Sequence, residues 1–195
     1  ETDGPINILV LGGSQGAHVF SEIIPQSLGL LPAELRRRLR VTQQARPEDV
    51  DATEASFRLH DVWCEIATFF ADVPERLATT HLLIGRSGAS TVAEVLTVGR
   101  PSILVPYPYA ADDHQAFNAH AVADAGAGWL MPQSAFAPPA LAARLESLFS
   151  LPATLEKAAA AARAVGRADA VVGLADMVSN LLPSSGESIS RGTAA

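Results

Sequence analysis

The chain has 195 residues, of which 48% are hydrophobic and 18% charged, and its net charge is −7. This length suits one domain, and the apolar content is that of a globular protein rather than a disordered one. The acidic balance argues against nucleic acid as a partner, because a nucleic-acid-binding surface needs clustered Lys and Arg.

Cys64 is the only cysteine, which excludes an intrachain disulfide and a cysteine-based metal cluster and favours a reducing compartment. No apolar stretch approaches the ~20 residues that span a bilayer, and no signal-peptide layout opens the sequence. The chain begins with Glu1 rather than Met, and a strand-like run follows closely. We therefore expect a soluble fragment of a longer protein.

Short apolar runs alternate with segments long enough for helices. The run at residues 6–11 is apolar apart from Asn7 and is followed by glycines, which is typical of a strand buried on both faces of a parallel sheet. Further strands are predicted at residues 39–42, 62–66, 81–84, 102–106 and 128–131. Helices are expected at residues 15–30, 47–57, 73–78, 91–98, 115–125, 138–149, 152–165 and 168–182. This alternation predicts an α/β fold with a doubly wound parallel sheet.

After Pro183 the sequence consists largely of Ser, Gly, Thr and Ala. Such a segment has too few apolar residues to hold a packed conformation. We expect one domain over residues 1–182 and a disordered tail over residues 183–195.

The first motif is LGGSQGAHVF at residues 11–20, where a strand runs through a glycine-rich turn into a helix. Glycines allow close backbone approach to a ligand, although the motif fits a ligand-free tight turn equally well. The glycine spacing is not GxGxxG, and the second strand ends in Gln43 and Gln44, where a dinucleotide fold places an acidic ribose ligand. A nicotinamide cofactor is disfavoured.

The second motif is GRSGASTVAEVL at residues 85–96. Amides of Ala89, Ser90 and Thr91 at the start of a helix could receive a diphosphate. Glu94 lies one turn further and could accept hydrogen bonds from a ribose diol, although an average Glu is simply solvated.

The third motif is VPYPYAADDHQAFNA at residues 105–119. Asp112 or Asp113 could cap the following helix, or His114 and Gln115 could reach a sugar or phosphate in the same crevice. Adjacent Asp and His residues without a second cluster are a weak metal-ligand set, so no metal site is predicted.

The fourth motif, TFFADVPE at residues 68–75, places two aromatic residues after a strand. Phe69 and Phe70 are either core residues or the place where a base is covered and read by the backbone. Trp63, Trp129 and Cys64 are expected in the core.

Together, GGSQGA, FxxDVPE, RSGASTVAE and DDHQxxNA closely resemble the C-terminal domain of the MurG family, the undecaprenyl-diphospho-muramoylpentapeptide N-acetylglucosaminyltransferases. The resemblance covers residues 6–182 in unbroken order. It implies a Rossmann-like domain that is the C-terminal half of a GT-B glycosyltransferase. The implied activity is inverting transfer of GlcNAc from UDP-GlcNAc to lipid I, giving lipid II in peptidoglycan and cell-wall synthesis.

The resemblance also implies the roles of ten residues in binding UDP-GlcNAc. Ser14 and Gln15 would lie near phosphate and sugar, and Phe69 with Phe70 would flank the uracil. The remaining implied contacts are diphosphate at Ala89, Ser90 and Thr91, ribose at Glu94, and GlcNAc with phosphate at His114 and Gln115. Several relatives carry Gln in place of His114, while Arg86 and Asn118 are implied to be structural.

The family's N-terminal acceptor domain, with the histidine of its GGTGGH motif, is absent from this sequence. The resemblance assigns the catalytic base, the lipid-linked acceptor and the membrane contact to that half. It implies a protein that is peripheral on the cytoplasmic face of the bacterial inner membrane and a fragment that is inactive alone. The alternatives are a free-standing nucleotide-sugar-binding subunit that needs a partner, and another UDP-sugar enzyme of GT-B fold, such as an epimerase.

Overall fold

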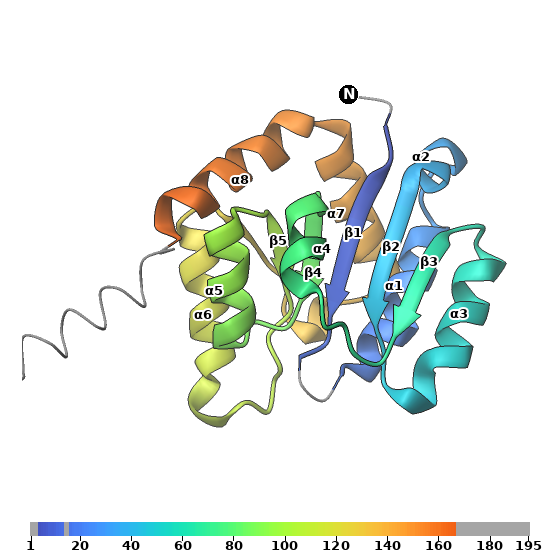
Figure 1. Ribbon diagram of the computed structural model, residues 1–195, viewed down its shortest axis with the longest axis horizontal. Coiled ribbons are helices and arrows are strands. Elements are labelled where there is room, and N and C mark those ends of the chain that lie inside the picture. Colours follow the sequence, from blue (N-terminus) through green and yellow to red (C-terminus); the bar gives the residue numbers. More distant parts are fainter. Residues whose placement is uncertain (1–3, 14–15, 167–195) are drawn as a thin grey trace, which may run out of the picture.

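The computed structural model describes residues 4–13 and 16–166. Within this part, one sheet contains the strands β1 (Ile6–Leu11), β2 (Leu39–Gln44), β3 (Trp63–Ala67), β4 (Leu82–Gly85), β5 (Ser102–Leu104) and β6 (Gly128–Leu130). Their order is β3-β2-β1-β4-β5-β6, and every neighbouring pair is parallel. The predicted doubly wound α/β sheet is thus confirmed (Figure 1).

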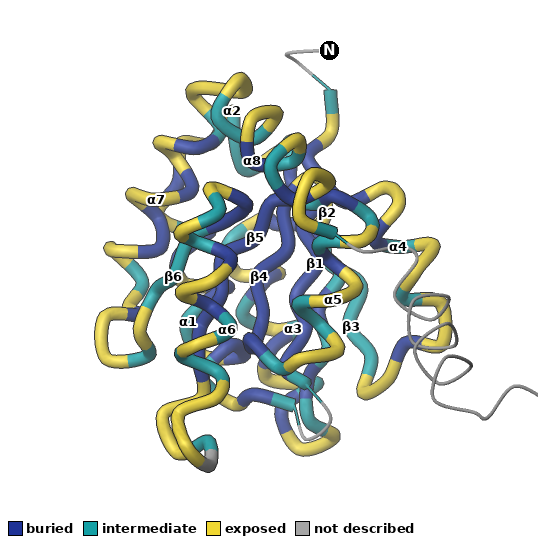
Figure 2. Tube along the Cα trace, turned by 90° about the vertical axis from the view of Figure 1, so that its left-hand side faces the viewer, coloured by how far each residue is buried: buried dark blue, intermediate teal, exposed yellow. Residues whose placement is uncertain are grey.

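Helices cover both faces of the sheet (Figure 2). One layer contains α1 (His18–Gly29), α3 (Val50–Leu59) and α7 (Pro138–Ser150). The opposite layer contains α4 (Val73–Thr79), α5 (Ala89–Val98) and α6 (His114–Asp124), and α8 (Pro152–Val165) packs against α5.

Strand β1 is apolar apart from Asn7 because both of its faces are covered. Ile8 and Val10 belong to the core under α1 and α7, whereas Leu9 and Leu11 belong to the core under α4, α5 and α6. Burying each such side chain contributes about 1.5–3 kcal/mol. The alternation along the strand explains why the apolar run of residues 8–11 forms a strand here.

Several helix boundaries differ from the predictions. Helix α2 (Ala33–Arg38) was not expected. None of its residues is buried, so the sequence shows no apolar periodicity that would predict it. A 3₁₀ helix at Pro47–Asp49 precedes α3, which the sequence predicts as one continuous helix. Helix α5 begins at Ala89, two residues before the predicted start, so that Gly88 is its N-cap.

The expectation that Trp63 lies in the core is wrong, because its side chain is 53% exposed. Trp63 begins β3, which pairs only with β2 and forms an edge of the described sheet. The half-buried Trp129 and Cys64 do pack against the core.

Three predicted features lie outside the described residues. They are the turn residues Ser14 and Gln15, the helix expected at residues 168–182, and the tail expected at residues 183–195.

The strand order creates one position suited to a ligand. From β1 the chain moves first towards β2 and β3, and then returns to the other side of β1 through β4. The loops that follow β1 and β4 therefore diverge at the carboxyl edge of the sheet. In open α/β sheets, ligands bind in the crevice that forms at such a reversal.

Candidate functional site

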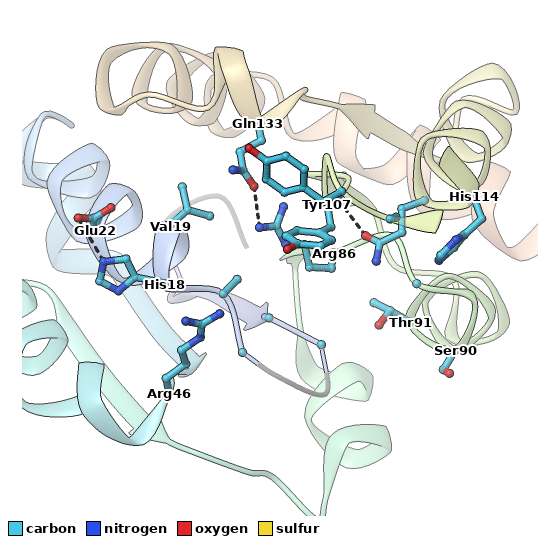
Figure 3. A pocket seen from close by; sticks show the side chains of 18 residues that line it. His18, Val19, Glu22, Arg46, Arg86, Ser90, Thr91, Tyr107, His114 and Gln133 are labelled. Carbon is cyan, nitrogen blue, oxygen red and sulfur yellow. Dashed lines mark hydrogen bonds and ion pairs between the residues drawn. The ribbon is translucent and has the colours of Figure 1, made fainter. Parts of the chain in front are cut away.

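A cavity of about 780 Å³ lies at this edge, between the turns that follow β1, β4 and β5. Its walls combine polar side chains with four glycines and several apolar side chains, and Figure 3 shows the polar groups that face it. The lining residues are Gly12, Gly13, Gly16, Ala17, His18, Val19, Glu22, Arg46, Arg86, Gly88, Ser90, Thr91, Tyr107, Tyr109, Ala110, His114, Gln115 and Gln133.

The glycines of the first turn are required by its backbone. A Cβ atom on Gly12 would lie 2.5 Å from the amide nitrogen of Ala17. Gly16 has a φ of +66°, and a Cβ atom there would meet the side chain of Arg46 at 2.8 Å. The tight-turn interpretation therefore accounts for both residues without a ligand.

The second turn is different, because nothing in the fold requires a glycine at position 88. Gly88 has a φ of −63°, and no atom lies within 4 Å of the position that its Cβ atom would take. It is the N-cap of α5, and no side chain caps the helix. The first-turn amides, which include those of Ser90 and Thr91, have no partner within the helix, so they are available to an anion in the cavity.

Arg86 forms the floor of the cavity and is only 7% exposed. Its guanidinium donates to the carbonyl oxygens of Val105 and Pro106 at 3.0 and 3.1 Å, and to Oε1 of Gln133 at 2.7 Å. It also lies over the rings of Phe20 and Tyr107. Burial lowers the pKa of Arg86. The side chain thus holds the loop after β5 in place, which agrees with the structural role implied by the resemblance.

The second and third motifs are joined by hydrogen bonds. The Ser87 hydroxyl donates to the Gln115 carbonyl oxygen at 2.7 Å, and the Asn118 amide donates to the Ser87 carbonyl oxygen at 2.9 Å. The backbone N–H of Tyr107 donates to Gln115 Oε1 at 3.0 Å. These bonds fix the starts of α5 and α6 relative to each other, and they leave the Gln115 amino group as its donor towards a ligand.

Neither aspartate before α6 caps this helix through its side chain. Asp113 is the N-cap residue, but its side chain makes no capping hydrogen bond. Asp112 and Asp113 both have a φ of +50°, in the left-handed region that aspartate tolerates better than most residues. This tight turn brings His114 and Gln115 to the wall of the cavity.

Four of the predicted site residues line the cavity together, and they are Ser90, Thr91, His114 and Gln115. Ala89 begins α5 beside them without lining the cavity. Glu94 is exposed one helical turn beyond Ser90, also outside the lining.

Phe69 and Phe70 also lie outside the lining, and their environments differ. Phe69 is 73% exposed, whereas Phe70 is buried in the core beneath α4 and α5. The Arg76 guanidinium lies 4.3 Å from the centre of the Phe70 ring. Phe70 is therefore a core residue, and its backbone rather than its ring remains available to a ligand.

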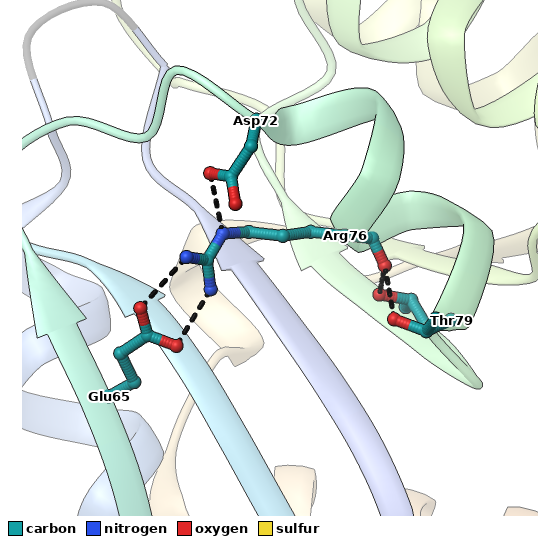
Figure 4. Close-up of polar contacts among 5 residues, drawn as sticks. Glu65, Asp72, Arg76 and Thr79 are labelled. Carbon is teal, nitrogen blue, oxygen red and sulfur yellow. Dashed lines mark hydrogen bonds and ion pairs between the residues drawn. The ribbon is translucent and has the colours of Figure 1, made fainter.

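Arg76 connects the loop of Phe69 and Phe70 to the sheet through hydrogen bonds (Figure 4). Its guanidinium donates to both carboxylate oxygens of Glu65 on β3, at 2.7 and 2.8 Å, and to Asp72 at 2.8 Å. The hydrogen bond from Arg76 holds the pKa of Asp72 below its usual range. The contacts fix the loop that carries Phe69 and Phe70 between β3 and α4.

The sequence predictions missed the basic residues at the far end of the cavity. His18 is the first residue of α1, and Arg46 follows β2. His18 Nδ1 lies 2.8 Å from Asp49 Oδ1, and His18 Nε2 lies 3.4 Å from Glu22 Oε1. The hydrogen bond to Asp49 raises the pKa of His18. One sequence signal could have identified His18 and Arg46 as cavity residues. Each follows a predicted strand, and parallel strands end at the same edge of the sheet.

No three His, Cys, Asp or Glu side chains in residues 4–13 and 16–166 gather in a way that could hold a metal ion. No helix in that part of the chain is long and apolar enough to cross a membrane.

Comparison with known proteins gives consistent matches. The family model of the glycosyltransferase family 28 C-terminal domain matches residues 7–174. The chain is 55% identical over 181 residues to a UDP-N-acetylglucosamine--N-acetylmuramyl-(pentapeptide) pyrophosphoryl-undecaprenol N-acetylglucosamine transferase of Paramagnetospirillum magneticum, covering 93% of this chain and 49% of that protein. It is 57% identical over 175 residues to a protein of the same name from Rhodospirillum centenum, covering 90% and 46%.

Among solved structures, the chain is similar to MurG of Acinetobacter baumannii, with a TM-score of 0.83 and 32% sequence identity. The match covers 91% of this chain and 53% of that one. The chain thus spans about half the length of the relatives that it matches.

Proposed function

Because the chain belongs to the family of glycosyltransferase family 28 C-terminal domains, we propose that it is the UDP-GlcNAc-binding half of an inverting N-acetylglucosaminyltransferase. The observation that carries this proposal is the open space at Gly88 beside the uncapped start of α5. A glycine that the backbone does not require, next to amides without helix partners, supports close approach by a phosphate.

In this proposal the donor extends along α5. The diphosphate lies against Ala89, Ser90 and Thr91, and Glu94 accepts hydrogen bonds from the ribose one turn further. The uracil then reaches the loop of Phe69 and Phe70. Because Phe70 is buried, its backbone reads the base edge and the exposed Phe69 covers the ring.

The sugar occupies the other side of the diphosphate. His114 and the Gln115 amino group lie on the cavity wall, where they donate hydrogen bonds to GlcNAc hydroxyls and phosphate. Ser14 and Gln15, which lie outside the described residues, are proposed to contact the same part of the donor.

The complete reaction needs the half that this chain does not contain. A hydroxyl oxygen of the acceptor sugar bonds to the anomeric carbon as the bond to UDP breaks, and UDP keeps the electron pair. The hydroxyl proton passes to a base on the other half, while the α5 amides stabilise the departing charge. The acceptor is an N-acetylmuramyl-pentapeptide pyrophosphoryl-undecaprenol, as in the names of the relatives. We place the complete protein on the cytoplasmic face of the membrane, which it contacts through that other half.

Isothermal titration of the chain with UDP-GlcNAc, UDP-GalNAc, GDP-mannose and NADH tests the donor. We expect selective binding of UDP-GlcNAc. Glu94→Ala should weaken it by about 1.5–3 kcal/mol, because a charge-assisted ribose contact is lost. The matched control is Glu146→Ala, which removes an exposed carboxylate of α7 on the other helix layer. Failure of every uridine nucleotide to bind, or preferential binding of NADH, would overturn the proposal.

A further inference from the structure

The amino edge of the sheet, where the strands begin, carries the densest run of positive charge in the chain. Four of the 14 basic residues fall within residues 36–40, although the net charge is −7. They form the end of α2 and the start of β2. Figure 1 shows α2 at the end of the sheet opposite to the arrowheads of the strands, whereas the proposed donor cavity lies after the strands. This basic run is therefore remote from the donor site.

Arg36, Arg37 and Arg40 form no ion pair with a carboxylate in the part of the chain that the structure describes. Arg36 donates to the Gly29 carbonyl oxygen at 3.1 Å. Arg40 donates through Nη1 to the carbonyl oxygens of Arg37 and Leu39, at 3.1 and 2.8 Å. These bonds close the end of α2 and hold the Arg40 guanidinium beside Arg37, but carbonyl oxygens do not neutralise the charges. Arg37 and Arg40 are both exposed, so their charges face the solvent side by side.

A hollow of about 280 Å³ adjoins this charge, on the face of the sheet opposite to α3. On β2, Leu39 and Val41 are buried in the core beside α3, whereas Arg40 and Thr42 point the other way and line the hollow. Trp63 is the register partner of Arg40 on β3, and it lines the same hollow. The lining residues are Asn7, Ile8, Leu9, Arg40, Thr42, Trp63, Arg76, Thr79 and Thr80.

Trp63 leaves a large apolar ring in contact with water on an otherwise polar face of the sheet. Its side chain is 53% exposed, and among the described residues no guanidinium lies over its ring. Arg76, the second guanidinium of the hollow, is already neutralised by Glu65 and Asp72 (Figure 4). Trp and Arg are enriched among the residues that contribute most to protein–protein interfaces. An exposed Trp beside Arg side chains without carboxylate partners is thus typical of a docking surface for a protein.

We propose that Arg37, Arg40 and Trp63 form a docking surface for an acidic segment of another protein. Carboxylates of the segment pair with Arg37 and Arg40, and an apolar side chain between them enters the hollow against Trp63. Charge complementarity selects this partner, because the rest of an acidic chain repels acidic proteins and only this surface attracts them. A nucleic acid would need a much wider basic surface. In the proposed transferase the carboxyl edge faces the acceptor half, so the amino edge stays accessible.

A short synthetic peptide of Glu residues with one central Leu tests the surface, and its affinity is measured by fluorescence anisotropy of a labelled form. We expect saturable binding that weakens as salt is added. Arg37→Gln and Arg40→Gln should each weaken it about threefold, and Trp63→Ala about tenfold or more. Arg144→Gln is the matched control, because Arg144 is an exposed arginine of α7 on the other face of the sheet. In a Trp129→Phe background Trp63 is the only tryptophan, so a blue shift of its emission reports contact with the peptide.

Changes in the peptide separate the two kinds of contact. Gln in place of every Glu should abolish binding, and Gly in place of Leu should weaken it and remove the shift of Trp63 emission. No binding of the acidic peptide, or binding that Arg37→Gln and Arg40→Gln leave unchanged, would overturn the proposal. Binding to phosphatidylglycerol vesicles that depends on Arg40 and exceeds peptide binding would assign the surface to a membrane instead of a protein. Arg40→Gln should leave UDP-GlcNAc binding unchanged, so this test and that of the donor site can fail independently.

Discussion

Glycine has two different roles at the two turns of the cavity. At Gly12 a side chain would collide with the backbone of Ala17, whereas at Gly88 it would enter open space. Gly12 is therefore required by the backbone of the turn, whereas Gly88 leaves space that a ligand in the cavity could occupy. A motif written as letters cannot separate these roles, because both residues follow a strand and precede a helix.

Substituting alanine at each position tests this difference. Gly88→Ala should change the free energy of unfolding by less than about 0.5 kcal/mol, since its φ of −63° suits alanine and only a weak N-cap preference is lost. It should weaken UDP-GlcNAc binding about tenfold or more, because the methyl group would occupy space assigned to phosphate. Gly12→Ala should instead destabilise the fold by about 1–3 kcal/mol through backbone displacement. Urea denaturation and calorimetry measure both effects, and unchanged donor affinity in Gly88→Ala would contradict the role assigned to this turn.

At the scale of elements, the predictable features were those with a periodic apolar pattern. All six strands were predicted within a few residues, because each packs apolar side chains against at least one of the two cores. Helix α2 was missed because it is short and has no fully buried residue, and only the partly buried Leu35 packs against the core, so no apolar periodicity marks it. Each predicted cavity residue belongs to a motif that follows one strand. Arg46, by contrast, lies near His18 only because β2 pairs with β1. Pairing between strands cannot be read from one apolar run.

The link between β3 and α4 is one such long-range feature, and it can be tested through Arg76. Arg76→Ala removes the contacts with Glu65 and Asp72, although these carboxylates are about half exposed. Solvent screening therefore limits the loss of stability to about 0.5–1 kcal/mol. We expect a larger effect on the loop, seen as faster amide hydrogen exchange at Phe69 and Phe70 and as several-fold weaker UDP binding.

The control for this change is a ligand without a base. Pyrophosphate binding should be unaffected by Arg76→Ala, because no part of it reaches the loop of Phe69. Arg144→Ala, which removes an exposed arginine of α7, should change neither ligand. Equal weakening of UDP and pyrophosphate would mean that Arg76 supports the whole domain rather than the base-binding loop.

At the scale of the whole molecule, the described part of the chain forms a three-layered α/β/α unit with a core on each face of the sheet, and the chain spans about half of each relative. The proposed donor site belongs to one carboxyl edge of one sheet, so the fold of this half assembles most of it. The family resemblance predicted the fold and the start of α5 as a binding position, but it did not point to Arg46, because none of the four motifs includes this residue.

Two histidines should give the stability of the whole domain opposite dependences on pH. Hydrogen bonding to Asp49 raises the pKa of His18 above its usual value near 6.5, so its contribution is complete below pH 6.5 and is lost as pH rises through the folded-state pKa. Burial lowers the pKa of His81, and the charge of Arg100 adds to this. His81 Nδ1 accepts the Asn7 N–H at 3.0 Å, so its contribution is complete above pH 6.5 and is lost on acidification.

Both contributions are therefore fully present only near pH 6.5, and stability should decline on either side of it. Each decline should be a few tenths of a kcal/mol, because water screens both side chains. Asparagine can replace either ring nitrogen without titrating, so His18→Asn should flatten the profile only above pH 6.5 and His81→Asn only below it. Urea unfolding midpoints between about pH 5.5 and 8 measure this, with an unchanged m-value as evidence that the same surface is exposed. If His18→Asn altered the acidic side instead, the pairing with Asp49 would not control the charge of His18.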